Sequence, residues 1–257
     1  MAVTFGAFWA FSLGTTTVQA QTPDASQPAE AAGKLQLLKG DAARVWNWIL
    51  STSDNAGLPF VIIDKVAAVA FVFDAGGSLQ GSARVLVGLA RGDESVAGIG
   101  DRDISAIRPE ERTTPAGRFM ARFGETFGDQ NVLWVDYATS ISLHPVVTTN
   151  PKEHRLARIR SQAPADHRIT FGCINVPAAF YKDVVLAAFS GGKGVVYVLP
   201  DTRPLEEVFP GLAVPAPVAA GAPSEAATST AAQPTPTLPP AAASVPPAGG
   251  GAEARLK

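Results

Sequence analysis

Runs of β-branched and aromatic residues fill the middle of the chain and constrain its fold more than any other feature. They cover residues 60–63, 66–73, 83–89, 131–135, 140–143, 168–171 and 194–199. Short apolar runs of this composition, bounded by turn-forming residues, are typical of β-strands. The segment Asp74-Ala-Gly-Gly77 separates the second run from the third and predicts a hairpin turn, because glycine adopts positive φ freely. The sequence therefore predicts a mainly β domain.

Two helices are expected around these strands. The first is an amphipathic helix over residues 35–50, with Asp41 as its N-cap. Its Trp46 and Trp48 are expected to pack on the domain, the alternative being an exposed patch that stacks on sugars. The main helix covers residues 177–189, with Pro in its first turn and a Gly pair after its end. The expected architecture is a β-sandwich or mixed β fold of about 140 residues.

The two ends of the chain differ in composition from this domain. Residues 1–20 have the apolar run and small residues of a secretory signal, with cleavage before Gln21. No Lys or Arg precedes the run, so an uncleaved anchor and a partly buried helix are the alternatives. Residues 211–257 are rich in Ala and Pro and are expected to form a disordered tail. The expected organisation is a signal peptide (1–20), a low-complexity segment with the first helix (21–57), a catalytic domain (58–202) and the tail.

Charge and cysteine content narrow the classes of partner. The 257 residues carry 21 Lys and Arg against 23 Asp and Glu, a net charge of −2. Nucleic-acid binding needs a clustered excess of positive charge, so no nucleic-acid partner is expected. Cys173 is the single cysteine, which excludes an intramolecular disulfide and any multi-thiolate metal site. The chain also lacks the GxGxxG, P-loop, GxSxG and HExxH motifs.

The chemistry that remains is a pairing of Cys173 with a histidine. Cys173 follows a strand and precedes the 177–189 helix, where nearby backbone N–H groups would stabilise a thiolate. His144 ends the 140–143 strand and could reach the same place from a neighbouring strand. A strand-embedded cysteine is more often a small buried hydrophobe. In an exported protein, however, a lone thiol is open to oxidation and exchange, which favours a chemical role.

Four motifs, in order, resemble the L,D-transpeptidase (YkuD) family of bacterial cell-wall enzymes. They are the 60–74 strands with their Gly-Gly turn, Thr114-Pro-Ala-Gly-Arg-Phe119, Ser142-Leu-His144 and Thr170-Phe-Gly-Cys-Ile-Asn175. The resemblance covers residues 58–200 and omits both ends. It implies that this region has the family's fold, a mainly β domain with one main helix after the cysteine.

The resemblance also implies a role for each residue that matches the motif. Cys173 is similar to the nucleophile and His144 to the base, while Gly172 and Cys173 would offer backbone N–H groups to an oxyanion. Thr170 would line the pocket, and Asn175 would help to hold the loop or the substrate. No metal or organic cofactor is implied, because acyl transfer by a thiolate needs none.

The reaction implied is attack on a peptidoglycan stem tetrapeptide, at the bond between the meso-diaminopimelate centre and D-alanine. The acyl group then passes to an amine acceptor, which is diaminopimelate in a 3-3 cross-link or the lysine of a lipoprotein. Two rival functions stay open: an L,D-carboxypeptidase or wall-link hydrolase that uses the same thioester, and a non-catalytic peptidoglycan-binding module. The expected location is the periplasm, with a membrane involved only if the signal is uncleaved.

Departures from the family motif concern the neighbours of the two reactive residues. Phe171 replaces the motif's second histidine, and His167 is a candidate substitute, against the alternative of a solvated loop histidine. Pro145 follows His144 and keeps the carbonyl that the other ring nitrogen needs. The spacer of residues 145–169 is long and basic. One interpretation is a lid over the site, in which Arg158 and Arg160 bind substrate carboxylates. The alternative is a solvated run of charged residues.

Overall fold

The computed structural model describes residues 38–125 and 131–213. The expected signal over 1–20, the low-complexity stretch that follows it, and nearly all of the expected 211–257 tail lie outside the described residues. Among the described helices, none has the length and apolar character needed to cross a membrane.

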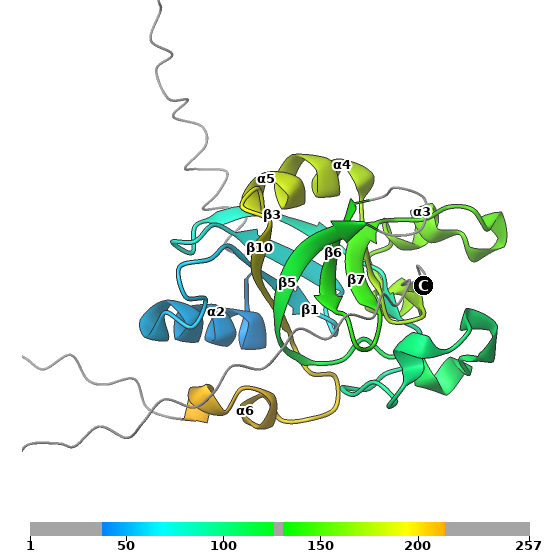
Figure 1. Cartoon of the computed structure of the whole chain (residues 1–257), viewed down its shortest axis with the longest axis horizontal. Helices are drawn as coiled ribbons and strands as arrows, with labels where there is room; N and C mark the ends of the chain where they lie inside the picture. Colours follow the sequence, from blue (N-terminus) through cyan, green and yellow to red (C-terminus); the bar gives the residue numbers. More distant parts are fainter. Residues whose placement is uncertain (1–37, 126–130, 214–257) are drawn as a thin grey trace, which may run out of the picture.

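A mixed sheet of eight strands forms the centre of the described fold (Figure 1). In sheet order the strands are β3 (Leu79–Arg84), β2 (Val69–Phe73), β1 (Phe60–Asp64), β10 (Lys193–Val198), β5 (Gly117–Glu125), β6 (Asn131–Asp136), β7 (Ile141–Pro145) and β9 (Ile174–Val176). The β1–β10 and β7–β9 pairs are parallel and the other pairs are antiparallel. A smaller sheet pairs β4 (Val87–Gly88) with β8 (Arg168–Thr170). The expected mainly β fold is confirmed, in its mixed form.

Helices cover both faces of the large sheet (Figure 1). On one face lies a continuous helical stretch made of α4 (Ala178–Phe180), a π-helical segment (Tyr181–Val185) and α5 (Leu186–Ala188). On the other lie α2 (Gly40–Thr52) and α6 (Leu205–Val208). A further short helix, α3 (Arg155–Arg158), lies between β7 and β8. Short 3₁₀ turns span Ile99–Asp101, Ile104–Ala106, Pro109–Glu111, Pro151–Glu153, Pro164–His167 and Pro210–Ala213.

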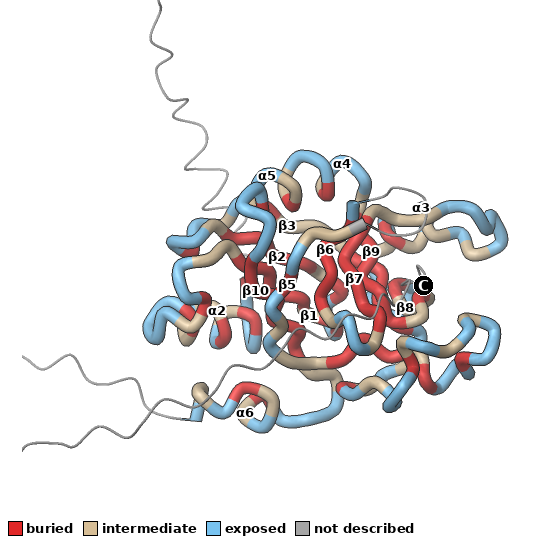
Figure 2. Tube along the Cα trace, in the orientation of Figure 1, coloured by how far each residue is buried: buried red, intermediate tan, exposed pale blue. Residues whose placement is uncertain are grey.

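Strands β1, β6 and β10 are buried on both faces over most of their length, which explains their unbroken apolar runs. In β1, Phe60 and Ile62 pack toward α2 and α6, whereas Val61 and Ile63 pack toward the α4–α5 stretch. Successive side chains of a strand point to opposite faces, so each face has its own core. Figure 2 shows the buried positions concentrated along these strands, beneath helices that are exposed on their outer sides.

The N-terminal helix differs from its expected start. α2 begins at Gly40 with Lys39 as its N-cap, and Asp41 lies in the first turn, where it pairs with Arg44 at 3.1 Å. An acidic residue in the first turn favours the helix through its dipole even when it does not cap it. Trp46 and Trp48 pack against the core under α2, as expected.

The strand boundaries show where the sequence pattern was insufficient. The 83–89 run is divided between β3 and β4, and β2 begins only at Val69. Strands β5 and β9 were not expected at all. In β5 alternate residues, Arg118, Met120 and Arg122, are exposed, so the strand has no continuous apolar run. The expected hairpin at 74–77 is present, with Gly77 at φ +84°.

At the start of the chain's C-terminal segment, ordered packing continues past the expected boundary of the domain. The turn Pro210–Ala213 lies against α2, and a side chain at Gly211 would meet Trp48 at 2.8 Å. Phe209 is buried beside Trp48 and Tyr197. The folded part therefore extends to Ala213, beyond residue 202.

A buried lysine joins the end of β1 to two other segments. Lys65 is 1% exposed, and its Nζ donates hydrogen bonds to Gly92 O at 2.7 Å, Asp93 Oδ1 at 2.9 Å and Thr114 O at 2.8 Å. These three acceptors use all three N–H donors of an ammonium. Burial lowers the pKa of Lys65, an effect that Asp93 and Asp201 oppose. Asp93 and Asp201 therefore stabilise the protonated form of Lys65.

The aspartates of this cluster fix the chain after β10. Asp93 accepts backbone hydrogen bonds from Asp201, Thr202 and Arg203, at 2.6 to 2.8 Å. Burial raises the pKa of the Asp93 carboxyl, but these N–H donors and Lys65 lower it more strongly, so it lies well below its usual range. Arg168 pairs with Asp201 and so adds β8 to the cluster.

Replacing Lys65 with Met should destabilise the protein strongly. Met keeps most of the side chain's length but leaves two buried aspartates with too little positive charge, so we expect the free energy of unfolding to fall by about 3–5 kcal/mol. Urea unfolding followed by tryptophan fluorescence measures this. Lys39→Met removes an exposed lysine and is the control; equal unfolding midpoints for the two variants would contradict the assignment.

Candidate active site

Strands β7 and β9 bring the expected reactive residues together. Their parallel pairing places His144 opposite Asn175, and Ser142 and Cys173 each precede one of these residues by two positions. Because alternate residues share a face, all four side chains lie on the same face of the sheet. Each of them is at most 1% exposed, and Ser142 Oγ lies 3.6 Å from Cys173 Sγ.

The ring of His144 is held in one tautomer. Nδ1 lies 2.8 Å from Pro145 O, and a carbonyl oxygen only accepts, so Nδ1 carries the proton. The carbonyl expected from Pro145 is thus in place. Nε2 is left with its lone pair, and Asn175 Nδ2 lies 3.1 Å from it. The His144 ring is therefore fixed by Pro145 on one side and by Asn175 on the other.

The thiol of Cys173 is more acidic than its burial alone would allow. Cys173 Sγ donates to Ser140 O at 3.7 Å and lies 3.6 Å from Ser142 Oγ. Burial raises the pKa of the thiol, but the nearby His144 side chain and the contacts with Ser142 lower it more strongly, so the net pKa lies below that of a free cysteine. A cysteine buried among apolar groups would have a raised pKa. His144 and Ser142 therefore offset the effect of burial on the Cys173 thiol.

A hydrogen-bond chain fixes the turn before Cys173. Gly172 N donates to Thr170 Oγ1 at 3.1 Å, and Thr170 Oγ1 donates to Cys173 O at 2.7 Å. Thr114 Oγ1 donates to Gly172 O at 2.7 Å and ties the turn to the Lys65 cluster. The Gly172 N–H is thus already engaged, which differs from its expected role toward an oxyanion. Among the described residues the Cys173 N–H has no acceptor.

Glycine is required at position 172 for two reasons. Its φ is +133°, a region that residues with a side chain rarely adopt. A Cβ there would also lie 2.5 Å from Ile141 Cδ1 and 2.7 Å from Thr113 O. The close approach of these two segments sets the position of Cys173 beside Ser142.

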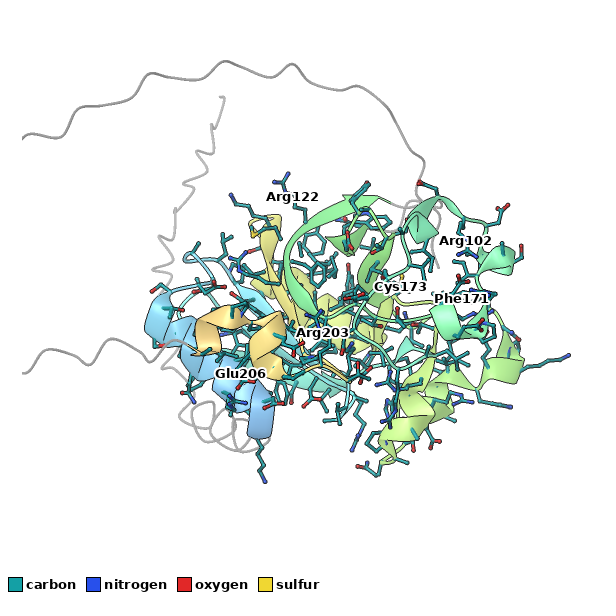
Figure 3. The ribbon with its side chains drawn as sticks, turned by 90° about the horizontal axis from the view of Figure 1, so that it is seen from below. Arg102, Arg122, Phe171, Cys173, Arg203 and Glu206 are labelled. Atoms are coloured by element: carbon teal, nitrogen blue, oxygen red, sulfur yellow. The ribbon has the colours of Figure 1, made fainter. Side chains whose placement is uncertain are left out.

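Phe171 carries a cation on its face. The guanidinium carbon of Arg112 lies 4.0 Å from the centre of the Phe171 ring, and the same guanidinium donates to Ile107 O. This is the geometry of a cation–π contact. Figure 3 shows Phe171 close to Cys173 and far from Glu206 at the α6 end. The position expected to hold a second histidine thus presents an aromatic ring with a positive charge over it.

The basic segment between β7 and β8 is partly folded and reaches the site through Arg155. Arg155 Nη1 donates to Asn175 Oδ1 at 2.9 Å, and its Nε pairs with Glu153. Arg158 donates to Glu153 O and Asp166 O, and so holds turns within the segment. Arg160 is exposed. The structure thus places Arg155, rather than Arg158 or Arg160, in contact with the expected site residues.

His167 matches neither of its expected roles. It is fully buried, with Nδ1 at 2.8 Å from Val85 O and Nε2 at 3.0 Å from Ser161 O. It is not a solvated loop histidine, and both ring nitrogens are occupied by carbonyl oxygens instead of facing Cys173. Its contacts tie the basic segment to the chain after β3.

Sequence reasoning missed three residues around the site. Ser142 could have been found, because it lies two positions before His144 on the same strand and shares its face. Arg112 and Arg155 have no such signal, because each reaches its partner only through the fold of a loop. Within residues 38–125 and 131–213, no group of three or more His, Cys, Asp or Glu residues is arranged to hold a metal ion.

Comparisons with known proteins give only low similarity. No protein-family model and no curated protein matches the chain. Three solved structures illustrate the structural similarity. The helical cell shape determining protein Pgp2 from Campylobacter jejuni has a TM-score of 0.36 and 13% identity, covering 62% of this chain and 56% of that one. A mutant of the same protein has a TM-score of 0.37 and 12% identity, covering 57% of this chain and 48% of that one.

The third structure is the catalytic domain from E. faecium L,D-transpeptidase, with a TM-score of 0.29 and 13% identity, covering 55% of this chain and 96% of that domain. The chain thus spans about half the length of the Pgp2 structures it matches, 48% and 56%. Because these sequence identities and TM-scores are low, a function can be argued only from the geometry of the site.

Replacing Gly172 with Ala should destabilise the turn before Cys173. The unfavourable φ and the contact with Thr113 O are expected to cost about 1–3 kcal/mol of unfolding free energy. Urea unfolding measures the loss. Gly191→Ala is the control, because nothing lies within 4 Å of a Cβ at that position. If both variants unfolded at the same urea concentration, the proposed need for glycine at 172 would be wrong.

Replacing His144 with Gln should move the reactivity of Cys173 to higher pH. The lowered pKa lets thiolate form at lower pH than in a free cysteine, and without His144 the effect of burial would dominate and raise the pKa. The rate of alkylation by iodoacetamide, measured by intact mass across a pH series, gives the midpoint. Cys173→Ser supplies the background. An unchanged midpoint would show that another group lowers the pKa.

Proposed function

We propose that this chain is an exported cysteine acyltransferase of the L,D-transpeptidase type, acting on peptidoglycan stem tetrapeptides through a Cys173 thioester. The observation that carries the proposal is the β7–β9 pairing, which brings Cys173, His144 and Asn175 together on one buried face. The lowered pKa of Cys173, to which His144 and Ser142 contribute against the effect of burial, supports the proposal. The order of the sequence motifs supports the choice of substrate class.

The first half of the reaction uses Cys173 and His144, whose side chains lie on the same face of the paired strands. His144 Nε2 takes the proton from Cys173 Sγ, and the thiolate attacks the carbonyl carbon between the diaminopimelate centre and D-alanine. The negative charge that develops on the carbonyl oxygen needs a donor, for which we assign the Cys173 N–H. When the C–N bond breaks, the protonated His144 gives its proton to the leaving amine of D-alanine. The product is a thioester on Cys173.

The second half of the reaction transfers the acyl group to an amine. The amine of a diaminopimelate side chain, or a lipoprotein lysine, attacks the thioester carbon and loses its proton to His144 Nε2. The C–S bond then breaks, and the thiol is restored. Water in place of the amine would give the hydrolase reaction, so the acceptor alone separates these two functions.

Substrate binding in this proposal involves the basic segment before β8. Cys173 is 1% exposed, so a substrate reaches Sγ only after a neighbouring segment moves. We place this movement in residues 145–168, because Arg155 joins that segment to Asn175. Arg158, Arg160 and the Arg112 that covers Phe171 would bind the free carboxylates of a stem peptide. Export, expected from residues 1–20, would bring the protein to this substrate.

Intact mass spectrometry after incubation with a purified tetrapeptide donor tests the proposal. We expect the protein to gain the mass of the donor less D-alanine, because the thioester retains the acyl part. Cys173→Ala should show no adduct. His144→Ala should form the adduct slower by about 10²–10⁴-fold, since it lacks the base.

The products separate the rival functions. A cross-linked dimer or an amine conjugate supports the transferase, whereas release of the tripeptide alone indicates the hydrolase. A carbapenem serves as a second probe, because the family resemblance implies that it acylates a reactive Cys173. Failure of both donor and carbapenem to form an adduct, in a folded protein, would contradict the proposal and favour a non-catalytic wall-binding module.

A further inference from the structure

Asn175 stands between Arg155 and His144 and contacts both. Its Oδ1 accepts from Arg155 Nη1 at 2.9 Å, and its Nδ2 lies 3.1 Å from His144 Nε2. Asn175 is fully buried, and the Arg155 side chain is 10% exposed and also paired with Glu153. The three side chains form a chain that runs from the basic segment into the site.

The orientation of the Asn175 amide follows from the chemistry of its neighbours. A guanidinium has only donors, so the amide must turn its oxygen toward Arg155. The NH₂ group then faces His144 Nε2. Because Pro145 O holds the proton on Nδ1, Nε2 has a lone pair that can accept from this NH₂ group. Arg155 thus determines which group of Asn175 meets the base.

The same arrangement opposes the reactive form of the site. When Cys173 gives its proton to His144, Nε2 becomes an N–H donor and faces the N–H donors of Asn175. With the amide held this way, Asn175 offers this new N–H no acceptor and places a second donor 3.1 Å from it, which is unfavourable. The amide would have to turn its oxygen toward Nε2, which Arg155 prevents.

We propose that Arg155 is a positioning residue that holds the Asn175 amide and thereby keeps the resting Cys173–His144 pair as thiol and neutral imidazole. The step that it controls is transfer of one proton from Sγ to Nε2. The inference rests on the proposed function only in treating this pair as the reactive one. It is tested on the free protein, without turnover of any peptide.

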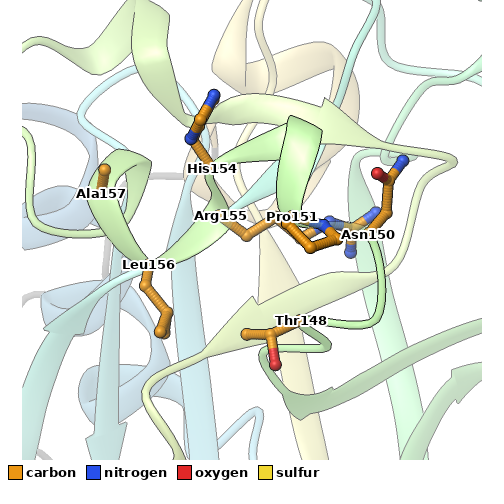
Figure 4. A pocket seen from close by; sticks show the side chains of 7 residues that line it. All are labelled: Thr148, Asn150, Pro151, His154, Arg155, Leu156 and Ala157. Atoms are coloured by element: carbon orange, nitrogen blue, oxygen red, sulfur yellow. The ribbon is translucent and has the colours of Figure 1, made fainter.

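Arg155 can be substituted without leaving a sealed cavity. It lines a pocket of about 290 Å³ together with Thr148, Asn150, Pro151, His154, Leu156 and Ala157. Figure 4 shows its side chain running from α3 toward Pro151 and Asn150, on the wall of this pocket. Water can therefore enter the space that a shorter side chain vacates, and a folded variant is expected.

The main test compares Arg155→Met with the unmodified protein. Without the guanidinium the amide is free to turn, so thiolate and imidazolium form more readily. We expect the midpoint of Cys173 alkylation by iodoacetamide to fall by about one pH unit, a tenfold rise in thiolate at a given lower pH. The ¹⁵N shift of His144 Nε2 should move toward that of a protonated nitrogen. Arg155→Lys keeps a donor and a charge, and should retain the original midpoint.

Two further variants make the outcome decisive. Asn175→Leu removes the NH₂ group that faces Nε2 and should shift the midpoint in the same direction, even if Arg155→Met does not fold. Lys152→Met removes an exposed positive charge from the same segment and should leave the midpoint unchanged. A rise in the midpoint of Arg155→Met would mean that Arg155 acts only through its charge, which stabilises thiolate, and would overturn the inference. An unchanged midpoint with an unchanged ¹⁵N shift would overturn it too.

Discussion

The position of the candidate site depends on one buried ammonium group. Lys65 Nζ binds the carbonyl of Thr114, and the Thr114 hydroxyl in turn binds Gly172, the residue before Cys173. A buried charge is tolerated only where every donor has a partner, so the segments that supply the acceptors cannot shift independently. Because Thr114 binds both Lys65 and Gly172, this constraint also fixes the residue before Cys173. A cluster outside the candidate site thus determines where Cys173 lies.

The two halves of the site are built by different means. His144 and Asn175 are placed by parallel pairing of β7 and β9, which fixes their register through the backbone. Cys173 lies immediately before β9 and depends on a glycine turn held by the Thr170 hydroxyl. Strand pairing is repetitive and tolerant, whereas such a turn depends on single side chains. Cys173 is therefore the more sensitive half of the candidate site.

The sequence was most informative where one pattern determined one outcome. The β-branched runs identified β1, β6 and β10, because strands buried on both faces are apolar throughout. The spacing of Ser142, Leu143 and His144 also correctly indicated a strand that carries the histidine to its end. Strand β5 was not predicted, because its exposed Arg118 and Arg122 break the apolar run. The role of Arg155 had no local pattern at all: its contact with Asn175 spans 20 positions and exists only once the intervening segment has folded.

The outer edge of the large sheet has a consequence for how any peptide could approach. β9 is the last strand of that sheet, and its Asn175 exchanges both backbone hydrogen bonds with Leu86, at 2.8 and 2.9 Å. An open edge lets an extended peptide add as a further strand, but here the N–H and C=O groups beside the site are already used. A peptide ligand must therefore be recognised by side chains, from the face of the sheet. Selectivity would then depend on the ligand's charged and apolar groups more than on its backbone.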